Sequence, residues 1–327
     1  MIYEKISGVS LPVSRMISGT AQYEDWMEEA PLFEVLDAAV ELGVNTIDSG
    51  REYADGECEK AIGNWMKNRK NREELVLISK GGHHNDIRKR VTPYDVTADI
   101  MDSLALLGTD YIDIYMLHRD DETKEVGPIV EMLHSHYEAG RIKTYGASNW
   151  SLERICEANE YAKSHGLRPF KVSSQHFSLG EQKCDPHGGG CISLTGDSMR
   201  DTREWYIEND MPLLAYSSLC MGLFSGRFNR GNYMEKCQAG LLPEPCVKAY
   251  CCEENFARLD RATELAKEKG VTTAAIAMAY VINYAKFYQL STFALVGSGN
   301  KAEVQANVDA VNLMLTKEEL DYLNIGE

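Results

Sequence analysis

The sequence predicts an α/β protein built as a closed (β/α)8 barrel, the TIM-barrel architecture, with residues 1–327 forming a single domain. Two observations support this prediction. Short β-rich segments alternate with amphipathic helical segments along the whole chain, and no linker or change of composition divides it. Eight such alternations favour a closed parallel barrel over an open sheet. The length of 327 residues accommodates such a barrel, which takes roughly 250 residues plus insertions.

The candidate strands are short runs rich in β-branched and other apolar residues. They are Met16–Gly19, Thr46–Asp48, Leu75–Lys80, Ile112–His118, Thr144–Ser148, Val172–His176, Leu213–Ser217 and Thr292–Gly297. The first strand is followed by GTAQYEDW, which lacks the glycine fingerprint of a Rossmann unit. Two long stretches, Glu181–Thr195 and Cys220–Glu253, are predicted to be irregular. Both follow the carboxyl ends of strands, where such barrels build active sites.

Helices are predicted between the strands from apolar periodicity and from capping signals. One apolar face is formed by Leu32, Val35, Leu36, Ala39 and Val40, and another by Ile129, Met132, Leu133 and His136. Thr92, Pro93 and Asp95 provide an N-cap, a proline at the first helical position and an early acid for the third helix. The Thr316-x-x-Glu319 pattern predicts a capping box for a last helix outside the repeat.

The charge and hydropathy of the chain exclude several kinds of partner. A net charge of −16 argues against binding to nucleic acid or to an anionic membrane. No apolar run is long enough to cross a bilayer, and the amino-terminal MIYEKISGVS has no apolar signal core. We therefore expect a cytoplasmic protein that acts on small molecules. The sequence gives no indication of its oligomeric state.

Nine cysteines are present, and free thiols are the default for a cytoplasmic protein of this size. The segment KCDPHGGGC brings Cys184, His187 and Cys191 close together, and such side chains can bind zinc. Only three ligands are visible, however, and their spacing matches no closed site. We therefore predict no metal.

Four ionisable residues lie at or just beyond the ends of three consecutive candidate strands. Asp48 ends the second strand, Tyr53 follows it by five residues, Lys80 ends the third and His118 ends the fourth. Because neighbouring strand ends of a parallel barrel meet at one mouth, we expect these side chains to converge. Each alone has a structural reading, such as a helix cap for Asp48 or a surface charge for Lys80. Four on consecutive strand ends favour a catalytic site.

This set of side chains can polarise and protonate a carbonyl group. The pKa of tyrosine is about 10, and a nearby ammonium favours the phenolate while a carboxylate holds that ammonium in place. The Asp48–Lys80 pair would thus tune Tyr53 as a general acid and base. A neutral His118 could orient the substrate oxygen through a hydrogen bond. Because no side chain supplies hydride, the chemistry requires a nicotinamide cofactor.

Several longer segments follow one another in a characteristic order and spacing. They include DSGREYADGECEKAIGNWM, LVLISK, DYIDIYMLHRDD, EAGRIKTYGASNW, PLLAYSSLCMGLFSGRF and ALVGSGNKAEVQANVDAV. Through these segments the chain resembles the aldo-keto reductases from about Arg15 to its end. The resemblance implies an oxidoreductase that interconverts a carbonyl (an aldehyde, ketone or sugar) and an alcohol with NADP(H) or NAD(H). It also implies that Tyr53 is the proton donor and that Asp48, Lys80 and His118 are its partners.

The resemblance further implies a cofactor site at the ends of the later strands. Ser148, Asn149 and Gln175 match residues that bind the nicotinamide carboxamide, and Tyr216 matches the aromatic residue that stacks on the nicotinamide. Gln175 and Tyr216 also have a simpler reading as barrel-core residues. The remaining matches are Ser217, Leu223, Gly226 and Arg227 over the pyrophosphate, with Gly297, Ser298 and Asn307 around the adenosine.

The adenosine segment GSGNKAEVQAN leaves the choice of dinucleotide open. Its one basic candidate for a 2′-phosphate is Lys301, Glu303 stands where a base or glutamine is common, and Ala306 replaces the usual acid. A carboxylate near the ribose would repel a 2′-phosphate, which favours NAD(H). The alternative is that Asn300-x-x-Glu303 forms a capping box, so that Glu303 turns back onto the helix start.

The candidate substrate site is predicted from residues beside the tetrad and is lined by Tyr23, Trp26, Arg51, Arg119 and Trp150. This mixture of aromatic and polar residues suits sugar-like or other polar carbonyl compounds. Arg51 and Arg119 could meet an anionic substrate, or the loops that carry them could be joined by a salt bridge.

Two alternative functions remain at this point. One is a nucleotide-binding regulatory member of the same fold with little turnover. The other is a metal-dependent barrel hydrolase or isomerase, which would need more acids and histidines at strand ends than Asp48 and His118 provide.

Overall fold

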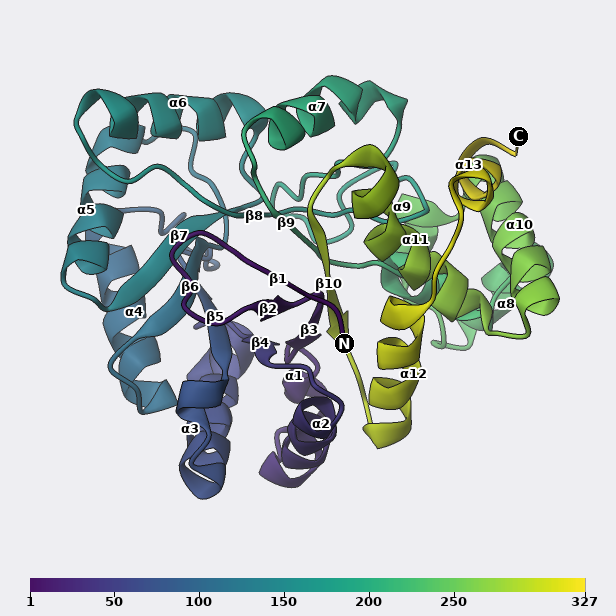
Figure 1. The fold of residues 1–327 in the computed structure, drawn as a ribbon, viewed down its shortest axis with the longest axis horizontal. Coiled ribbons are helices and arrows are strands. Elements are labelled where there is room, and N and C mark those ends of the chain that lie inside the picture. The colour runs from purple at the N-terminus through teal and green to yellow at the C-terminus, as the bar shows by residue number, and fades with distance from the viewer. Residues whose placement is uncertain (327) are drawn as a thin grey trace. The chain divides into compact units, whose positions relative to one another are not determined.

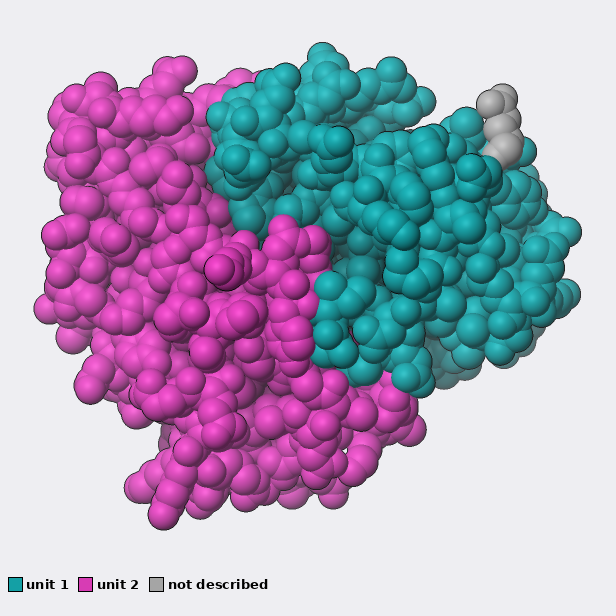
Figure 2. Space-filling view, in the orientation of Figure 1, with its two compact units in different colours: residues 1–2, 175–296, 306–327 teal, residues 3–174, 297–305 magenta. Residues whose placement is uncertain are grey.

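Eight parallel strands form a closed barrel in the computed structural model, which describes residues 1–326 (Figure 1). The strand order around the barrel is β10-β3-β4-β5-β6-β7-β8-β9, so each strand pairs with its neighbour in sequence and the last pairs with the first. The predicted (β/α)8 barrel is therefore confirmed. By internal contacts the chain divides into two compact units, shown in Figure 2 and described separately below. The single-domain assignment for residues 1–327 remains a prediction.

Unit 2 comprises residues 3–174 and 297–305 and contains the first six barrel strands. These are β3 (Met16–Gly19), β4 (Thr46–Asp48), β5 (Val76–Gly81), β6 (Ile112–Leu117), β7 (Ile142–Ser148) and β8 (Ser173–Ser174). The connecting elements are α1 (Tyr23–Trp26), α2 (Glu29–Glu41), η1 (Tyr53–Gly56), α3 (Glu57–Arg69), η2 (Arg72–Glu74), α4 (Pro93–Leu107), α5 (Val126–Glu138) and α6 (Leu152–Ser164). A short antiparallel pair, β1 (Tyr3–Glu4) and β2 (Val13–Ser14), precedes them and was not predicted.

The helices of unit 2 pack on the outside of its strands as the apolar periodicity predicts (Figure 1). Helix α2 buries Leu32, Val35, Leu36 and Ala39, and Val40 of the same predicted face is half-buried. The predicted start of α4 is confirmed, because the Thr92 hydroxyl accepts a hydrogen bond from the Asp95 amide. All six residues of β5 and of β6 are buried, including the polar residues Ser79, Lys80 and Asp113 within these mainly apolar strands.

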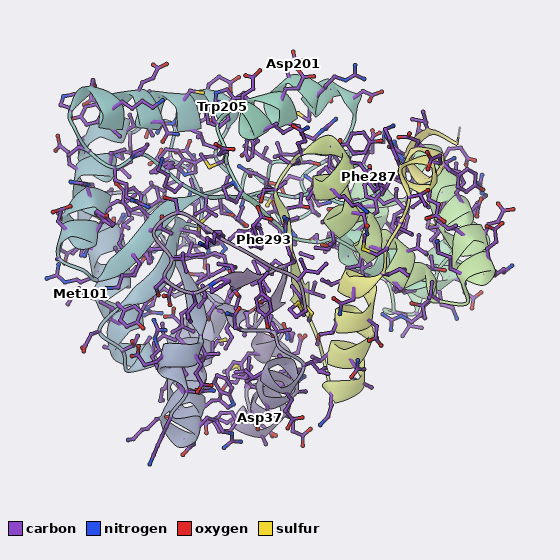
Figure 3. All side chains as sticks on the ribbon, viewed as in Figure 1. Asp37, Met101, Asp201, Trp205, Phe287 and Phe293 are labelled. Carbon is purple, nitrogen blue, oxygen red and sulfur yellow. The ribbon has the colours of Figure 1, made fainter. Side chains whose placement is uncertain are left out.

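Unit 1 comprises residues 1–2, 175–296 and 306–327. The elements that lie wholly in it are η3 (Asp197–Met199), α7 (Arg200–Glu208), β9 (Leu213–Ala215), η4 (Cys220–Ser225), α8 (Tyr233–Gln238), α9 (Glu244–Tyr250), α10 (Glu253–Lys269), α11 (Thr273–Tyr288) and α13 (Lys317–Ile325). It also holds β10 (Thr292–Gly297) except its last residue, and α12 (Lys301–Asn312) from residue 306 onward. Phe293 on β10, labelled in Figure 3, is fully buried. The predicted capping box of the last helix is confirmed at Thr316 and Glu319.

Two sequence predictions in unit 1 need correction. The stretch Cys220–Glu253, predicted to be irregular, contains η4, α8 and α9, whose few residues each are too short to show a helical period. Strand β9 ends at Ala215 rather than at Ser217, because Ser217 has a left-handed backbone with φ of 55°. Among the described residues, no helix is both long and apolar enough to cross a membrane.

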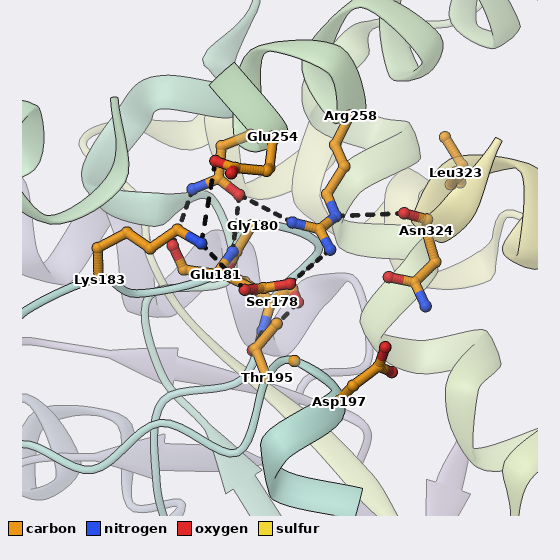
Figure 4. A network of polar contacts seen from close by, with 12 residues as sticks. Ser178, Gly180, Glu181, Lys183, Thr195, Asp197, Glu254, Arg258, Leu323 and Asn324 are labelled. Carbon is orange, nitrogen blue, oxygen red and sulfur yellow. Dashed lines mark hydrogen bonds and ion pairs between the residues drawn. The ribbon is translucent and has the colours of Figure 1, made fainter. Parts of the chain in front are cut away.

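A polar network fixes the loop after β8 within unit 1 (Figure 4). The Arg258 guanidinium on α10 donates to Glu181 Oε1 at 2.6 Å and to the carbonyl oxygen of Asn324 at 3.3 Å. The Asn255 side chain accepts from the Glu181 amide and donates to the Glu181 carbonyl, each at 2.8 Å. Helices α10 and α13 are therefore tied to the start of the loop by groups that are largely shielded from water.

Candidate active site

Three consecutive strands of unit 2 bring the predicted tetrad together. Strands β4, β5 and β6 lie side by side in parallel, with Asp48 paired to Ile78 and Lys80 paired to Met116. Asp48 is the last residue of β4, Lys80 lies one residue before the end of β5, and His118 directly follows β6. The carboxyl ends of these strands therefore present the three side chains at the same edge, as the sequence predicted.

The Lys80 ammonium is the centre of this group. Its Nζ lies 2.5 Å from Asp48 Oδ2, 2.9 Å from the carbonyl oxygen of Ser49 and 3.1 Å from the Tyr53 hydroxyl oxygen. Lys80 is 3% exposed and Asp48 is 1% exposed, so the ion pair is shielded from water. All three ammonium hydrogens thus have a partner, and one of them is the Tyr53 hydroxyl.

His118 completes the group beside Tyr53. The centroids of the two rings lie 5.7 Å apart with the planes nearly perpendicular. His118 is buried, and its Nδ1 has no hydrogen-bond partner among the described residues. An imidazole in this position can bind a substrate oxygen without competition from a protein carboxylate.

The loop that carries Tyr53 has an unusual backbone. The next two residues, Ala54 and Asp55, have φ values of 51° and 53°, in the left-handed region that non-glycine residues rarely adopt. The amide of Ala54 donates to Glu24 Oε1 at 2.9 Å, and the amide of Tyr53 donates to the Gly50 carbonyl at 3.0 Å. These contacts hold a strained turn that a sequence pattern does not reveal, and such strain concentrates at functional sites.

Burial and neighbouring charges shift the pKa values of the group. Burial raises the pKa of Tyr53, and the nearby Lys80 charge opposes this rise without cancelling it. The sequence argument that the ammonium would favour the phenolate must therefore be corrected, because desolvation is the larger effect. Burial alone would lower the pKa of Lys80, but Asp48 and Tyr53 outweigh it, so the pKa is raised. Burial, followed by the Lys80 charge, lowers the pKa of His118 well below its ordinary value.

The sequence analysis missed two histidines next to the tetrad. His83 and His84 follow β5 in the segment KGGHHND, and the His83 ring lies 4.7 Å from the His118 ring. The Nδ1 atom of His83 lies 2.8 Å from the His84 carbonyl oxygen, and Nε2 of His84 lies 3.0 Å from the Asp120 carbonyl oxygen. Their position directly after a strand end was the signal that pointed to the site.

The predicted substrate residues differ in how deeply they are buried and in the partners they contact. Tyr23 is buried on α1 and Trp26 is half-buried on the same helix. The Arg51 Nε lies 3.4 Å from Asp102 Oδ2 on α4, so no salt bridge joins the Arg51 loop to the Arg119 loop among the described residues. Trp150 is fully buried and its Nε1 donates to the Arg119 carbonyl at 3.0 Å, which makes it a support for that loop rather than an exposed wall.

Five of the predicted cofactor residues, Ser148, Asn149, Gly297, Ser298 and Glu303, lie in unit 2. Ser148 ends β7 next to Asn149, whose backbone is left-handed with φ of 60° and whose Nδ2 donates to Ser148 Oγ at 3.0 Å. Gly297 ends β10 close to the Gln22 side chain, which donates to the Ser298 carbonyl at 3.0 Å.

Glu303 is turned back onto the start of α12. Its Oε2 accepts from the Gly299 amide at 2.8 Å, while the Glu303 amide donates to Asn300 Oδ1 at 3.0 Å. Lys301 lies 3.0 Å from Glu41. Of the two readings of Glu303, these contacts favour the capping role.

The other predicted cofactor residues lie in unit 1. Gln175 is fully buried, its carbonyl accepts from the Tyr216 amide at 3.3 Å, and Tyr216 is half-exposed just after β9. Ser217 has a left-handed backbone with φ of 55°. Leu223 is buried in η4, and Gly226, the residue after η4, has a φ of 82°. Arg227 is exposed, and its Nε lies 3.3 Å from Ser225 Oγ. Asn307 is half-buried on α12.

The cysteine-rich loop from Cys184 to Cys191 is held together by the Asp185 carboxylate. Asp185 Oδ2 accepts from the amides of Gly189, Gly190 and Cys191 at 2.8 to 3.1 Å. These bonds counteract burial and lower the pKa of Asp185 to about 2. Within residues 1–326, no three His, Cys, Asp or Glu side chains are grouped so that they could hold a metal ion.

Comparisons with known proteins agree with the fold. A model described as the aldo/keto reductase family matches residues 15–325. A probable aryl-alcohol dehydrogenase of Saccharomyces cerevisiae is 29% identical over 312 residues, which span 91% of this chain and 88% of that protein. An NADP(+) aryl-alcohol dehydrogenase of Phanerodontia chrysosporium is 26% identical over 315 residues, covering 91% of this chain and 76% of that protein.

Among solved structures, a glycerol dehydrogenase of Gluconobacter oxydans superposes with a TM-score of 0.78 at 22% identity. The superposition covers 99% of this chain and 96% of that one, and shows that the two share a fold. The chain belongs to the aldo/keto reductase family. It is an oxidoreductase that acts on carbonyl and alcohol groups, and the family is generally NAD(P)H-dependent.

Proposed function

We propose that this oxidoreductase uses NADP(H) or NAD(H) and that Tyr53 exchanges the proton with the substrate oxygen. The observation that supports this proposal is the contact of the Lys80 ammonium with both Asp48 and the Tyr53 hydroxyl. A buried ion pair can often be replaced by apolar side chains without loss of stability, so a buried lysine points to a chemical role. Its contact with a tyrosine hydroxyl suits proton transfer.

The roles of the four residues follow from their protonation states. The raised pKa of Tyr53 keeps its hydroxyl protonated near neutral pH, so in reduction it donates that proton to the alkoxide oxygen. The adjacent Lys80 ammonium stabilises the phenolate that remains, and Asp48 holds the ammonium in place. His118, neutral because its pKa is lowered, donates a hydrogen bond to the same oxygen. Oxidation reverses the proton transfer, and the nicotinamide supplies or accepts hydride when bound.

The proposed cofactor residues offer suitable chemistry in each unit. In unit 2, the polar side chains of Ser148 and Asn149 directly follow β7 and can bind a carboxamide. In unit 1, Arg227 is exposed and has no acidic partner among the described residues. It follows Gly226, whose backbone is left-handed, a conformation that glycine adopts readily. An unpaired guanidinium next to a glycine suits a pyrophosphate group. Tyr216 is half-exposed, as a residue that stacks on a nicotinamide must be.

The capping contact of Glu303 bears on the choice of dinucleotide. A carboxylate that accepts from the Gly299 amide is committed to the helix start, so the argument from Glu303 toward NAD(H) loses its main support. Lys301 is exposed and its pairing with Glu41 is weak enough to be displaced by a phosphate. Both dinucleotides therefore remain in the proposal.

Aromatic aldehydes and the corresponding alcohols are the substrate class we propose to examine first, because two of the similar proteins are named aryl-alcohol dehydrogenases. Trp26 on α1 is partly exposed and offers aromatic surface for such substrates, while Tyr23 on the same helix is buried. Sugar-like carbonyl compounds are the second class, as the polar side chains of Arg51 and Arg119 suggest. The acidic composition supports our further proposal that the partners are small molecules rather than nucleic acids or membranes. A cytoplasmic location is part of the same proposal.

Steady-state kinetics with the purified chain tests this proposal. Benzaldehyde and glyceraldehyde reduction should consume NADPH or NADH, and benzyl alcohol oxidation should regenerate the reduced cofactor. The ratio of kcat/KM for the two dinucleotides then assigns the cofactor. If neither cofactor supports turnover in either direction while both bind, the regulatory alternative replaces the catalytic one.

A further inference from the structure

Arg119 is a buried cation without an acidic partner. It follows His118 after β6 and is 9% exposed. The hydrogen bond that its guanidinium makes runs from Nη1 to the His118 carbonyl at 3.1 Å, while Nε has no partner. No carboxylate lies within ion-pair distance of it among residues 1–326. Burial of a guanidinium is costly unless it is paired, so this position calls for an explanation.

The acids closest to Arg119 in the sequence are engaged elsewhere. Asp120 binds the Arg154 guanidinium, with Oδ2 at 3.0 Å from Nε. Asp121 accepts from the Thr123 hydroxyl at 2.7 Å and lies 4.0 Å from Lys89. Trp150 meanwhile fixes the Arg119 backbone through its bond to the carbonyl oxygen. The guanidinium is therefore held in position but is not neutralised.

Three histidines lie near Arg119 in the fold. His118 directly precedes it, the His83 ring lies 4.7 Å from the His118 ring, and His84 Nε2 lies 3.0 Å from the carbonyl oxygen of Asp120, the next residue. The positive charge of Arg119 acts on His83, His84 and His118, where after burial it helps to lower each pKa. Lys80 adds a second cation on the His118 side, and its charge is paired with Asp48. Two acids lie near the histidines: Glu52 Oε1 is 3.8 Å from His83 Nδ1, and the Asp121 charge acts on His84.

The loop that carries the histidines is fixed rather than free. Arg88 makes a two-pronged ion pair with Asp95 at 2.7 and 2.8 Å, and Arg90 Nη2 lies 2.6 Å from Asp99. Both acids belong to α4, which anchors the loop at its far end. His83 and His84 are therefore presented beside Arg119 by an ordered scaffold.

We propose that Arg119, next to His83 and His84, is the binding residue of a subsite for an anionic group, so that the preferred substrates are aldehydes, ketones or alcohols that carry a carboxylate or a phosphate. This inference rests on the proposed function, because it assumes that the reacting oxygen binds at Tyr53 and His118. A guanidinium binds both oxyanions through paired hydrogen bonds. The one N–H of each neutral imidazole faces a backbone carbonyl, so His83 and His84 donate to the anion only when they are protonated. Since Arg119 directly follows His118, the anionic group lies close to the reacting carbon.

Matched substrate pairs test the subsite. We would compare kcat/KM for 3- and 4-carboxybenzaldehyde with those for their methyl esters, and for glyceraldehyde 3-phosphate with that for glyceraldehyde. The ratio of the anionic to the neutral member is the readout. We expect a ratio of about 10 or more in at least one pair, and the pair that shows it distinguishes carboxylate from phosphate.

Substitutions assign the preference to Arg119. The Arg119→Met variant should lower the anionic-to-neutral ratio by about 10- to 100-fold, and Arg119→Lys should lower it less, because lysine keeps the charge but not the planar fork. If Arg119→Met does not fold, Arg119→Lys still provides the test. The matched control is Lys124→Met, which removes one positive charge from an exposed position of the loop after β6 and should leave the ratio unchanged.

Two results would overturn the subsite. One is a ratio near 1 for every pair in the unmodified enzyme, and the other is an unchanged ratio in both Arg119 variants. Either would leave the proposed function intact as long as the neutral aldehydes are reduced. If no member of any pair is reduced with either dinucleotide, the proposed function itself fails.

Discussion

At the scale of single residues, desolvation decides the state of the two groups that meet the substrate. Burial raises the pKa of Tyr53 even though a cation lies 3.1 Å away, and it lowers the pKa of His118 further than the Lys80 charge alone would. The unliganded site therefore holds a phenol and a neutral imidazole near neutral pH. This combination suits reduction, in which one group must give up a proton and the other must donate a hydrogen bond.

The pH dependence of reduction follows from these directions. We predict that kcat/KM for aldehyde reduction is flat between about pH 6 and 9 and falls only at higher pH, where Tyr53 begins to lose its proton. His118 contributes no inflection near its ordinary pKa, because its pKa in the folded protein lies well below that range. A pH profile with one neutral aldehyde measures this. The prediction is contradicted if kcat/KM also falls on the acid side with a midpoint near pH 6.5 while cofactor binding does not. That result would show that His118 titrates in this range.

At the scale of elements, the loops after the strands depend on contacts that are distant in the sequence. The loop after β8 in unit 1 is joined to α10 through Glu181 and Arg258, which are 77 residues apart. Helix α13 joins the same network through the Asn324 carbonyl (Figure 4). The Arg258 side chain is only 10% exposed, so its hydrogen bonds are little weakened by solvent.

Removal of the Arg258 guanidinium should therefore destabilise the protein. We predict that Arg258→Met lowers the free energy of unfolding by about 2 kcal/mol, the typical cost of losing hydrogen bonds to a charged group. Urea denaturation followed by circular dichroism measures this change. The control is Arg230→Met, which removes a guanidinium whose partners on α10, Glu253 and Asp260, are 71% and 63% exposed. Equal effects of the two variants would contradict the structural role of Arg258.

These elements also show what the sequence could and could not predict. The strands Met16–Gly19, Thr46–Asp48 and Thr292–Gly297 were predicted to the residue, because buried parallel strands leave uninterrupted apolar runs. Asp48, Lys80 and His118 were predicted to converge for the same reason, since each ends such a run. The turn at Ala54 and the pairing of Arg51 with Asp102 were not predicted, because both depend on partners that only the folded chain brings near.

At the scale of the whole molecule, unit 2 buries ionisable groups that the tetrad does not use. Glu59 on α3 is fully buried, and its Oε1 accepts from the Ser79 hydroxyl at 2.6 Å while Oε2 has no partner. Burial raises the pKa of Glu59 to about 7, and hydrogen bonds from Ser79 and Ser103 oppose the rise only in part. The folded protein therefore keeps a proton on Glu59 at a pH where the unfolded chain has released it.

This difference makes global stability depend on pH. Between about pH 4.5 and 7 the folded state binds one proton more at Glu59 than the unfolded state, so the contribution of Glu59 is fully present below pH 4.5 and is lost as pH rises through 7. The loss amounts to about 3 kcal/mol. We predict that the Glu59→Gln variant gains stability relative to the unmodified protein by this order of magnitude when the pH is raised from 4.5 to 8.

Urea unfolding at several pH values measures the difference between the two proteins. The control is Glu57→Gln, an exposed position at the start of the same helix, which should show no such trend. Parallel stability curves for Glu59→Gln and the unmodified protein would show that Glu59 ionises normally in the folded state.

The central claim is that the Tyr53 hydroxyl, held by Lys80 and Asp48, transfers the proton to the substrate oxygen. Its most direct test is a single-turnover measurement of hydride transfer from bound NAD(P)H to an aromatic aldehyde in the Tyr53→Phe variant. We predict that the rate falls by about 100- to 10,000-fold, while the dissociation constant of the dinucleotide, measured by fluorescence titration, stays within a few-fold of its original value. A rate equal to that of the unmodified enzyme, with the dinucleotide fully bound, would contradict the account.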